Sequence, residues 1–254
     1  MPMYKSRRAM SRRAGTRRVG AVKRRNVRRV RFAPKSKAGF FQIVRKLPEF
    51  WLQNTATAGT PRLGWISGGS EVAYTGTTMQ LGTLTPGMNG SVDIPFAMNF
   101  RLSDIINYTD ITSIADNYKL KSVYVRILPS FTQVGLPSIY NYPSMQWDID
   151  KDDGTVPTVD LLRQKMGVKT RTFKAGQYIG IKISYPNIQA VVADNTGTTS
   201  AMPIGNRWLD AVDVNVPHLG LKGVFSNVDL PTSASAKVAF KFDVAYTLQA
   251  KNLQ

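Results

Sequence analysis

The feature that most constrains this chain is the separation of its charge. Residues 1–48 contain 17 Lys and Arg and no acidic residue, and the first acid is Glu49. The rest of the chain holds 17 basic and 16 acidic residues, so almost all of the net charge of +18 lies in one terminal segment. This separation indicates a tail that binds a polyanion and a nearly neutral body that packs against other protein surfaces.

The basic segment, residues 1–38, has few large apolar side chains, and its charges repel one another. It cannot bury enough surface to offset the entropy of ordering, so we expect it to be disordered when free. Arginine binds phosphate through a planar fork and stacks on bases, which predicts sequence-independent binding of nucleic acid rather than a merely solvated tail. The predicted contacts are Arg7, Arg8, Arg12, Arg13, Arg17, Arg18, Lys23, Arg24, Arg25, Arg28, Arg29, Arg31, Lys35 and Lys37.

One short run within this segment has the composition of a nuclear localisation signal. It consists of Lys23, Arg24, Arg25, Arg28 and Arg29. Such a run predicts binding to host nuclear import factors, although any arginine-rich segment contains similar runs.

The body, residues 39–254, reads as an all-β sandwich of about eight strands. Tyr118–Pro129 alternates between two faces, and strands are also predicted at Phe40–Asn54, Ser91–Phe100, Ser144–Ile149, Thr170–Phe173, Tyr178–Tyr185, Trp208–Val216, Gly220–Phe225 and Ala236–Gln249. Short helices are expected within Ser103–Asn117, with Ser103 as N-cap, and at Val159–Met166. Residues 190–206 are small and polar and are expected to form a loop, and Gly68-Gly69 to form a turn.

Several short sequence segments, taken in order, resemble segments of the capsid proteins of circoviruses and related circular Rep-encoding single-stranded DNA viruses. They are the arginine-rich segment, FFQIVRKLPEFW, ADNYKLKSVYVRILPSF, WDIDKDDG, WLDA followed by HLGLKG, and KVAFKFDVAYTLQ. The resemblance implies an eight-stranded jelly roll with long loops and a T=1 icosahedral shell of sixty copies. It also implies a single-stranded DNA genome bound by the arm, a location in the virion, and a host-nucleus stage during assembly.

Catalytic and metal-binding patterns are weak. Asp148, Asp150 and Asp152 suggest a calcium loop, but Asp153 stands where that loop needs glycine and Val159 where it needs glutamate. We expect an acidic strand end and turn instead. An alternative is that these carboxylates meet basic residues of a neighbouring subunit. The one histidine, His218, is expected to be structural, and no nucleophile elbow, phosphate loop or cysteine occurs. We therefore expect no enzyme activity, no cofactor and no metal.

The aromatic residues are expected mainly in the core or at interfaces, including Trp51, Trp65, Trp147 and Trp208. An aromatic side chain that meets the genome should lie near the basic segment, as Phe32, Phe40 and Phe41 do.

Two alternatives stay open at this point. One is a non-viral basic nucleic-acid-binding β-barrel protein, which would carry a basic face on its folded domain. The near-neutral body argues against it. The other is a magnesium-dependent nuclease that uses Asp148, Asp150 and Asp152. No apolar run is long enough to span a membrane, so no membrane partner is expected, and nothing in the sequence identifies a cell-surface receptor.

Overall fold

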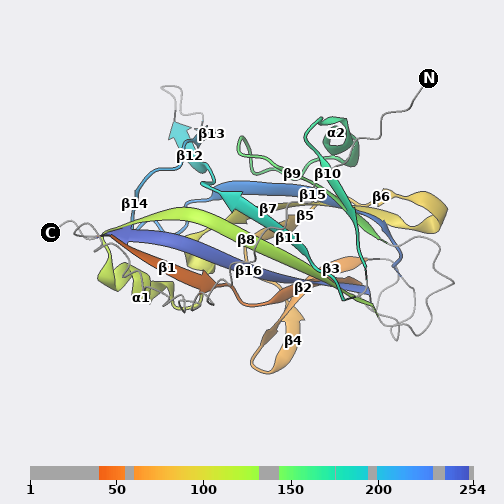
Figure 1. The fold of residues 1–254 in the computed structure, drawn as a ribbon, viewed down its shortest axis with the longest axis horizontal. Coiled ribbons are helices and arrows are strands. Elements are labelled where there is room, and N and C mark those ends of the chain that lie inside the picture. The colour runs from red at the N-terminus through yellow and green to blue at the C-terminus, as the bar shows by residue number, and fades with distance from the viewer. Residues whose placement is uncertain are drawn as a thin grey trace, which may run out of the picture. The chain divides into compact units, whose positions relative to one another are not determined.

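The computed structural model describes residues 40–54, 60–131, 143–174, 176–193, 199–230 and 238–251. These residues form two antiparallel sheets that pack face to face as a jelly roll (Figure 1). The all-β prediction is therefore confirmed, with sixteen strands in the described part of the chain rather than about eight.

Sheet A has the strand order β11-β8-β16-β2-β3-β4, with β1 also paired to β16 and β14 to β8. Its strands are β1 (Phe40–Lys46), β2 (Phe50–Asn54), β3 (Pro61–Ser67), β4 (Ser70–Ala73), β8 (Asn117–Phe131), β11 (Ile179–Ser184), β14 (Leu209–Asp210) and β16 (Val238–Lys251). The longest pairing joins β8 to β16 over almost their full lengths.

Sheet B has the order β10-β9-β15-β12-β13, with β7 paired to β15 and with β5 and β6 paired to β7. Its strands are β5 (Met79–Leu81), β6 (Thr85–Pro86), β7 (Val92–Phe100), β9 (Ser144–Ile149), β10 (Lys169–Thr172), β12 (Ile188–Ala193), β13 (Thr199–Ile204) and β15 (His218–Val228). Within the described ranges, four short helices join strands: η1 (Met88–Gly90), η2 (Leu102–Asp104), α1 (Tyr108–Ile114) and α2 (Val159–Gln164).

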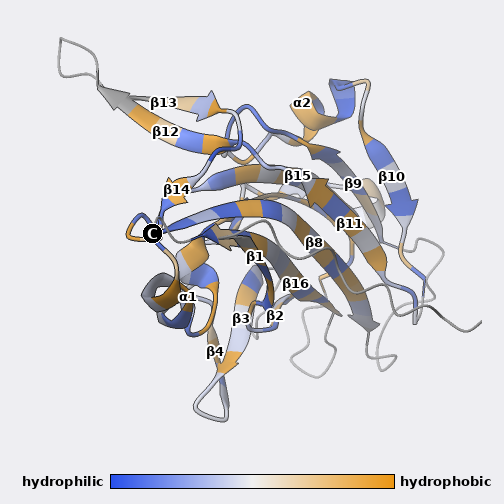
Figure 2. Cartoon of the chain, turned by 60° about the vertical axis from the view of Figure 1, so that its left-hand side comes forward, coloured by the Kyte–Doolittle hydropathy of each residue, from blue (hydrophilic) through white to orange (hydrophobic). Residues whose placement is uncertain are grey.

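The core lies between the two sheets and is rich in aromatic rings. Phe240 of β16 stacks on Phe225 of β15, with ring centroids 4.7 Å apart, and Phe100 of β7 meets Tyr246 of β16 at 5.8 Å. All four side chains are fully buried. Apolar and polar residues alternate along β8 and β11 (Figure 2). One face of sheet A therefore packs into this core, and the other face points outward.

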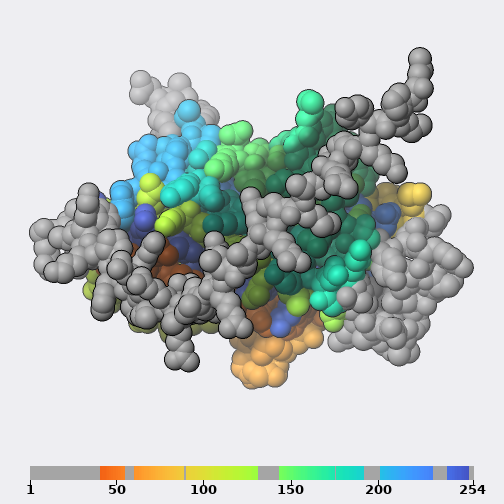
Figure 3. All heavy atoms as spheres, in the orientation of Figure 1, coloured from red at the N-terminus to blue at the C-terminus, as the bar shows by residue number. Residues whose placement is uncertain are grey.

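Two hairpins project from the sheets (Figures 1 and 3). The β3–β4 hairpin turns at Gly68-Gly69 as predicted, and both glycines have positive φ, 59° and 81°, as a tight two-residue hairpin turn requires. The β12–β13 hairpin corrects a prediction, because residues 190–206 were expected to form a loop. Its paired residues include Val191 and Ala201, and small side chains alone did not reveal this backbone pairing.

Two other expectations were wrong in detail. Helix α1 begins only at Tyr108, preceded by Asn107 in the left-handed region, while Ser103 lies inside η2 and is not an N-cap. The predicted strand Trp208–Val216 is reduced to Leu209–Asp210, because Asp210 accepts a hydrogen bond from the Val212 N–H and turns the chain. No helix in the described ranges is long and apolar enough to cross a membrane.

Candidate nucleic-acid interface

The predicted phosphate contacts from Arg7 to Lys37, including the predicted nuclear localisation run, lie outside the described residues. What the structure fixes is the point at which this segment joins the body. The first described residue, Phe40, pairs with Lys251 at the end of β16, and Lys251 in turn pairs with Asn117 at the start of β8. The basic segment is therefore joined to one end of sheet A. We call this end of the sheet the arm root.

Cationic and aromatic side chains lie at the arm root. The Lys251 ammonium lies 5.0 Å from the centre of the Trp208 ring, and the Lys119 ammonium lies 5.9 Å from the centre of the Tyr185 ring. Lys121 donates a hydrogen bond of 3.2 Å to the Gln42 side chain. Cation–ring pairs of this kind hold lysines beside aromatic surfaces, a combination that single-stranded nucleic acid binds well.

The aromatic residues discussed in the sequence analysis lie in different environments. Phe32 lies outside the described residues, nothing is described of the Phe40 side chain, and Phe41 is half-buried. Trp147 lies in the core as expected, with 9% of its surface exposed, and Trp65 packs against the core. Tyr185 was not singled out from the sequence. The signal that could have identified it is its place directly after the alternating strand β11.

The acidic turn after β9 is neutralised within the chain. Lys165 lies 2.6 Å from Asp150 and 3.7 Å from Asp148, and the buried Lys222 lies 3.3 Å from Asp150 and also contacts Asp153. The alternative in which these carboxylates meet a neighbouring subunit stays a prediction. Within the chain, α2 and β15 already bring lysines to Asp148 and Asp150.

Burial alone would raise the pKa of Asp150. Hydrogen bonds from Lys165 and from the Asp152 N–H, together with the charge of Lys222, outweigh burial and lower this pKa to about 2. No group of three or more potential metal ligands occurs among the described residues. The arrangement is thus a network of ion pairs that fastens α2 and the acidic turn to sheet B.

His218 is buried, as a structural histidine should be, with 1% of its surface exposed. Its Nδ1 lies 3.1 Å from the Phe100 carbonyl oxygen and 3.2 Å from that of Val216, so we assign the proton to Nδ1. Burial lowers the pKa of His218 to about 4, and these carbonyls only partly oppose that shift. The ring is therefore neutral at pH 7 and joins β15 to β7.

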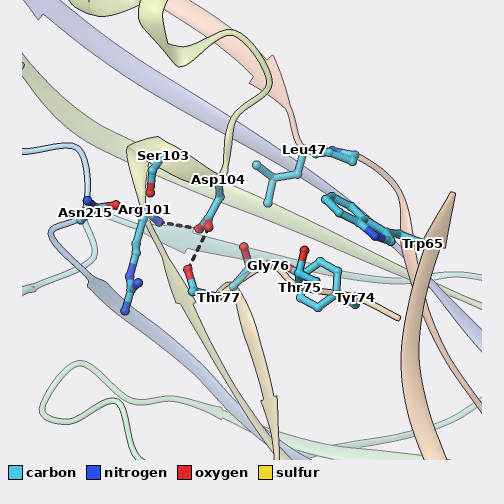
Figure 4. A pocket seen from close by; sticks show the side chains of 12 residues that line it. Leu47, Trp65, Tyr74, Thr75, Gly76, Thr77, Arg101, Ser103, Asp104 and Asn215 are labelled. Carbon is cyan, nitrogen blue, oxygen red and sulfur yellow. Dashed lines mark hydrogen bonds between the residues drawn. The ribbon is translucent and has the colours of Figure 1, made fainter. Parts of the chain in front are cut away.

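A cavity of about 300 Å³ lies between the β1–β2 connection and the segment before β5 (Figure 4). Trp65 and Tyr74 line one part of it and Asp104 another. Asp104 accepts hydrogen bonds from the Thr77 hydroxyl at 3.0 Å and from the Arg101 N–H at 2.9 Å. The carboxylate is thus occupied in holding two loops together rather than left open for a substrate.

Comparison with known proteins also points to a viral capsid protein. The family model described as circovirus capsid protein matches residues 3–254. A search of curated proteins finds no match. Among solved structures, the chain is similar to the "60-mer BFDV Capsid Protein", with a TM-score of 0.52 and 13% identity over 84% of this chain and 94% of that one. The "decameric BFDV Capsid Protein" gives a TM-score of 0.45 and 12% identity over 84% and 99%.

The structural likeness shows the fold, and the family match extends over nearly the whole sequence, including the basic segment. The chain belongs to the circovirus capsid protein family.

Proposed function

We propose that this viral capsid protein assembles into a T=1 shell of sixty copies around single-stranded DNA, which its basic N-terminal segment neutralises. The observation that carries this proposal is the charge separation, 17 basic residues and no acid in residues 1–48. The solved structure of similar fold is described as a 60-mer, which supports the copy number. Family membership removes the alternative of a non-viral β-barrel protein.

The amount of charge suits a small genome. Sixty copies would bring about 1000 positive charges from residues 1–48, enough to neutralise on the order of a thousand nucleotides, with small cations covering the rest. Binding would be independent of sequence, because phosphates carry no sequence information. A measured preference of about 1000-fold for one sequence over random single strands would contradict this part of the proposal.

No covalent chemistry enters the proposal. The family is one of structural capsid proteins, and two of the three carboxylates of the nuclease alternative, Asp148 and Asp150, are paired with Lys165. Incubating the protein with plasmid and Mg²⁺ tests the alternative directly. Nicking that disappears in Asp150→Asn would restore it.

Assembly is tested by electron microscopy and mass measurement of the purified full chain. The proposal expects closed particles in the megadalton range, whereas monomers of 28.2 kDa or small oligomers under all assembly conditions would contradict it.

Nuclear targeting by Lys23–Arg29 is a separate proposal. A reporter fused to residues 1–38 should enter the nucleus, and a reporter that stays in the cytoplasm would remove it.

A further inference from the structure

The near-neutral body hides an uneven distribution of charge between its strands. The adjacent strands β1, β16, β8 and β11 contain eight Lys and Arg and only one acid, Asp243. Their inward residues, such as Val125 and Phe242, form the core, so their outward residues form a separate surface. We call this surface the cationic face. Its charged members are Lys46, Lys119, Lys121, Arg126, Lys182, Lys241, Asp243 and Lys251.

The one acid on this face is itself covered by cations. Asp243 is paired with Arg126 and, at 3.3 Å, with Lys46, and only 9% of its side chain is exposed. Glu49, at the edge of the face, is paired with Lys241. Lys182 is exposed on β11, and no ion pair is found for it among the described residues. The excess of positive charge is therefore not cancelled on the face itself.

The strand register arranges these cations around small side chains. Lys46, Ala245, Tyr124 and Lys182 stand in one row across the four strands. In the neighbouring row Thr247, Ser122 and Ser184 lie side by side on β16, β8 and β11. Neighbouring strands are about 4.8 Å apart, so a row of three hydroxyl side chains lies beside a row that has a lysine at each end, and phosphates can contact groups of both kinds.

Three tyrosines stand on or beside the same face. Tyr124, Tyr178 and Tyr185 expose 38%, 48% and 49% of their surface. Tyr178 precedes β11 and Tyr185 follows it, so about 23 Å separates them at ~3.3 Å per residue. These rings offer flat surfaces at both ends of β11.

The tyrosine at the far end is part of a built recess. A hollow of about 490 Å³ is lined by Tyr124, Arg171, Gly176, Gln177, Tyr178 and Gly180. Gly180 makes room for it, because a Cβ there would overlap the Tyr124 hydroxyl. The Arg126 guanidinium lies 5.8 Å from the centre of the Tyr178 ring. Aromatic rings beside arginines in a hollow of this size suit an unstacked base and its phosphate.

Tyr185 adopts an unusual backbone conformation, with φ at 49°. A bulky residue in the left-handed region costs of order 1–3 kcal/mol, and such residues cluster at binding sites. Its N–H donates to the Lys121 carbonyl oxygen at 2.8 Å, and its ring lies beside Lys119. The strained residue thus presents an exposed ring at the arm root.

From these observations we propose that the cationic face is a second site for single-stranded nucleic acid, in addition to the basic segment. Lys119, Lys182 and Lys251 would contact phosphates, and Tyr185 and Tyr178 would stack on bases. The proposal rests on the proposed function and adds to it a role for the folded body, which the neutral total charge had concealed.

A second protein copy is a weaker occupant for this surface. Lysine is depleted in protein interfaces, and an interface would need acids to match these cations. The basic segment continues in the chain into Phe40, which pairs with Lys251 of the face, and the segment is itself positive. Because the face and the segment have the same sign of charge, a polyanion is the partner that suits both.

The test uses the full chain in two backgrounds: the natural one, and one in which Arg7, Arg8, Arg12, Arg13, Arg17, Arg18, Arg24, Arg25, Arg28 and Arg29 are all replaced by Ser. Binding to a fluorescent poly-dT oligonucleotide is measured across a range of salt concentrations. In the arm-substituted background, Lys182→Gln should reduce the slope of log K against log salt by about 0.7 and weaken binding about fivefold at 0.1 M salt.

Lys169→Gln is the matched control, because Lys169 is also an exposed strand lysine but lies on β10 of sheet B. It should leave slope and affinity unchanged. Tyr185→Ala should weaken binding on the order of tenfold, whereas Tyr185→Phe keeps the ring and the affinity.

The outcomes separate the two proposals. If the arm substitutions abolish binding and Lys182→Gln then equals Lys169→Gln, the face is not a site, while the role of the basic segment stands. If the arm substitutions leave binding unchanged, the proposed function fails. If the face variants prevent assembly of nucleic-acid-free particles without altering oligonucleotide binding, the face is a contact between copies and our inference is overturned.

Discussion

The two sheets use their charged residues in different ways. On sheet B, the central strand β15 carries a lysine that is paired within the subunit, since Lys222 is 5% exposed and paired with Asp150 and Asp153. On sheet A, most charged residues of the four strands are half-buried or exposed cations with few acids near them. The difference shows that a single net charge says little about a body whose sheets balance charge separately. One sheet uses charge for stability, and the other keeps it available for a ligand.

The largest expected difference in stability between the two sheets concerns Lys222. Lys222→Met removes a buried cation and leaves Asp150 and Asp153 undercompensated, so we expect a loss of about 3 kcal/mol in the free energy of unfolding. The control Lys182→Met, on the cationic face, should stay within about 0.5 kcal/mol of the parent. Urea denaturation of unassembled subunits measures both. Equal effects at the two positions would contradict the division between the sheets.

A second test concerns the pH dependence of sheet B. The His218 pKa is about 4 in the folded chain and about 6.5 when unfolded, so the unfolded chain binds the proton first as pH falls. Stability from this residue is complete above pH 6.5 and is lost as pH falls to about 4, by about 3 kcal/mol.

The measurement compares denaturation of the natural chain and of His218→Gln between pH 7 and pH 4.5. The variant is expected to be less stable at pH 7 and to show a smaller loss on acidification, because it lacks the titrating group. Parallel pH profiles for the two proteins would show that His218 does not titrate in this way.

A third test uses a substitution on sheet A that should lower stability but raise the affinity for an oligonucleotide. Asp243→Asn removes the one acid in the four strands and frees Arg126 and Lys46. We expect unfolding free energy to fall by roughly 1 kcal/mol, since both partners are partly exposed, while oligonucleotide affinity rises a few-fold. Weaker binding by this variant would mean that the ion pairs position the face rather than limit its charge.

The smallest expected effect concerns Tyr185. Tyr185→Asn places a residue that tolerates positive φ at this position, so stability should stay unchanged or rise by about 0.5 kcal/mol while oligonucleotide binding falls. Thermal denaturation and binding are measured on the same preparation. A clear loss of stability would assign Tyr185 to packing rather than to the ligand.

Much of the fold could be predicted because apolar and polar residues alternate along its strands. Val123, Val125 and Ile127 alternate with polar residues along β8, and the structure buries all three. The β12–β13 hairpin could not be predicted in this way, because its pairing connects backbone groups under small side chains such as Ala190 and Ala201.

The candidate site was predicted only in its sequence-local part. A run of arginines is visible in the sequence, but the cationic face joins lysines far apart in the chain, such as Lys46, Lys182 and Lys251, and only the strand register brings them together. Lys222 could not be assigned to Asp150 from the sequence for the same reason.

The central claim is that the basic N-terminal segment carries most of the genome binding. The most direct measurement is the mass of nucleic acid per particle for shells of the natural chain and of the chain with ten of its eleven arm arginines, all except Arg31, replaced by Ser. The account predicts that the substituted chain still forms particles but retains only the small fraction that the cationic face and the remaining basic residues of the segment can hold. Particles that contain as much nucleic acid as the natural ones would contradict it.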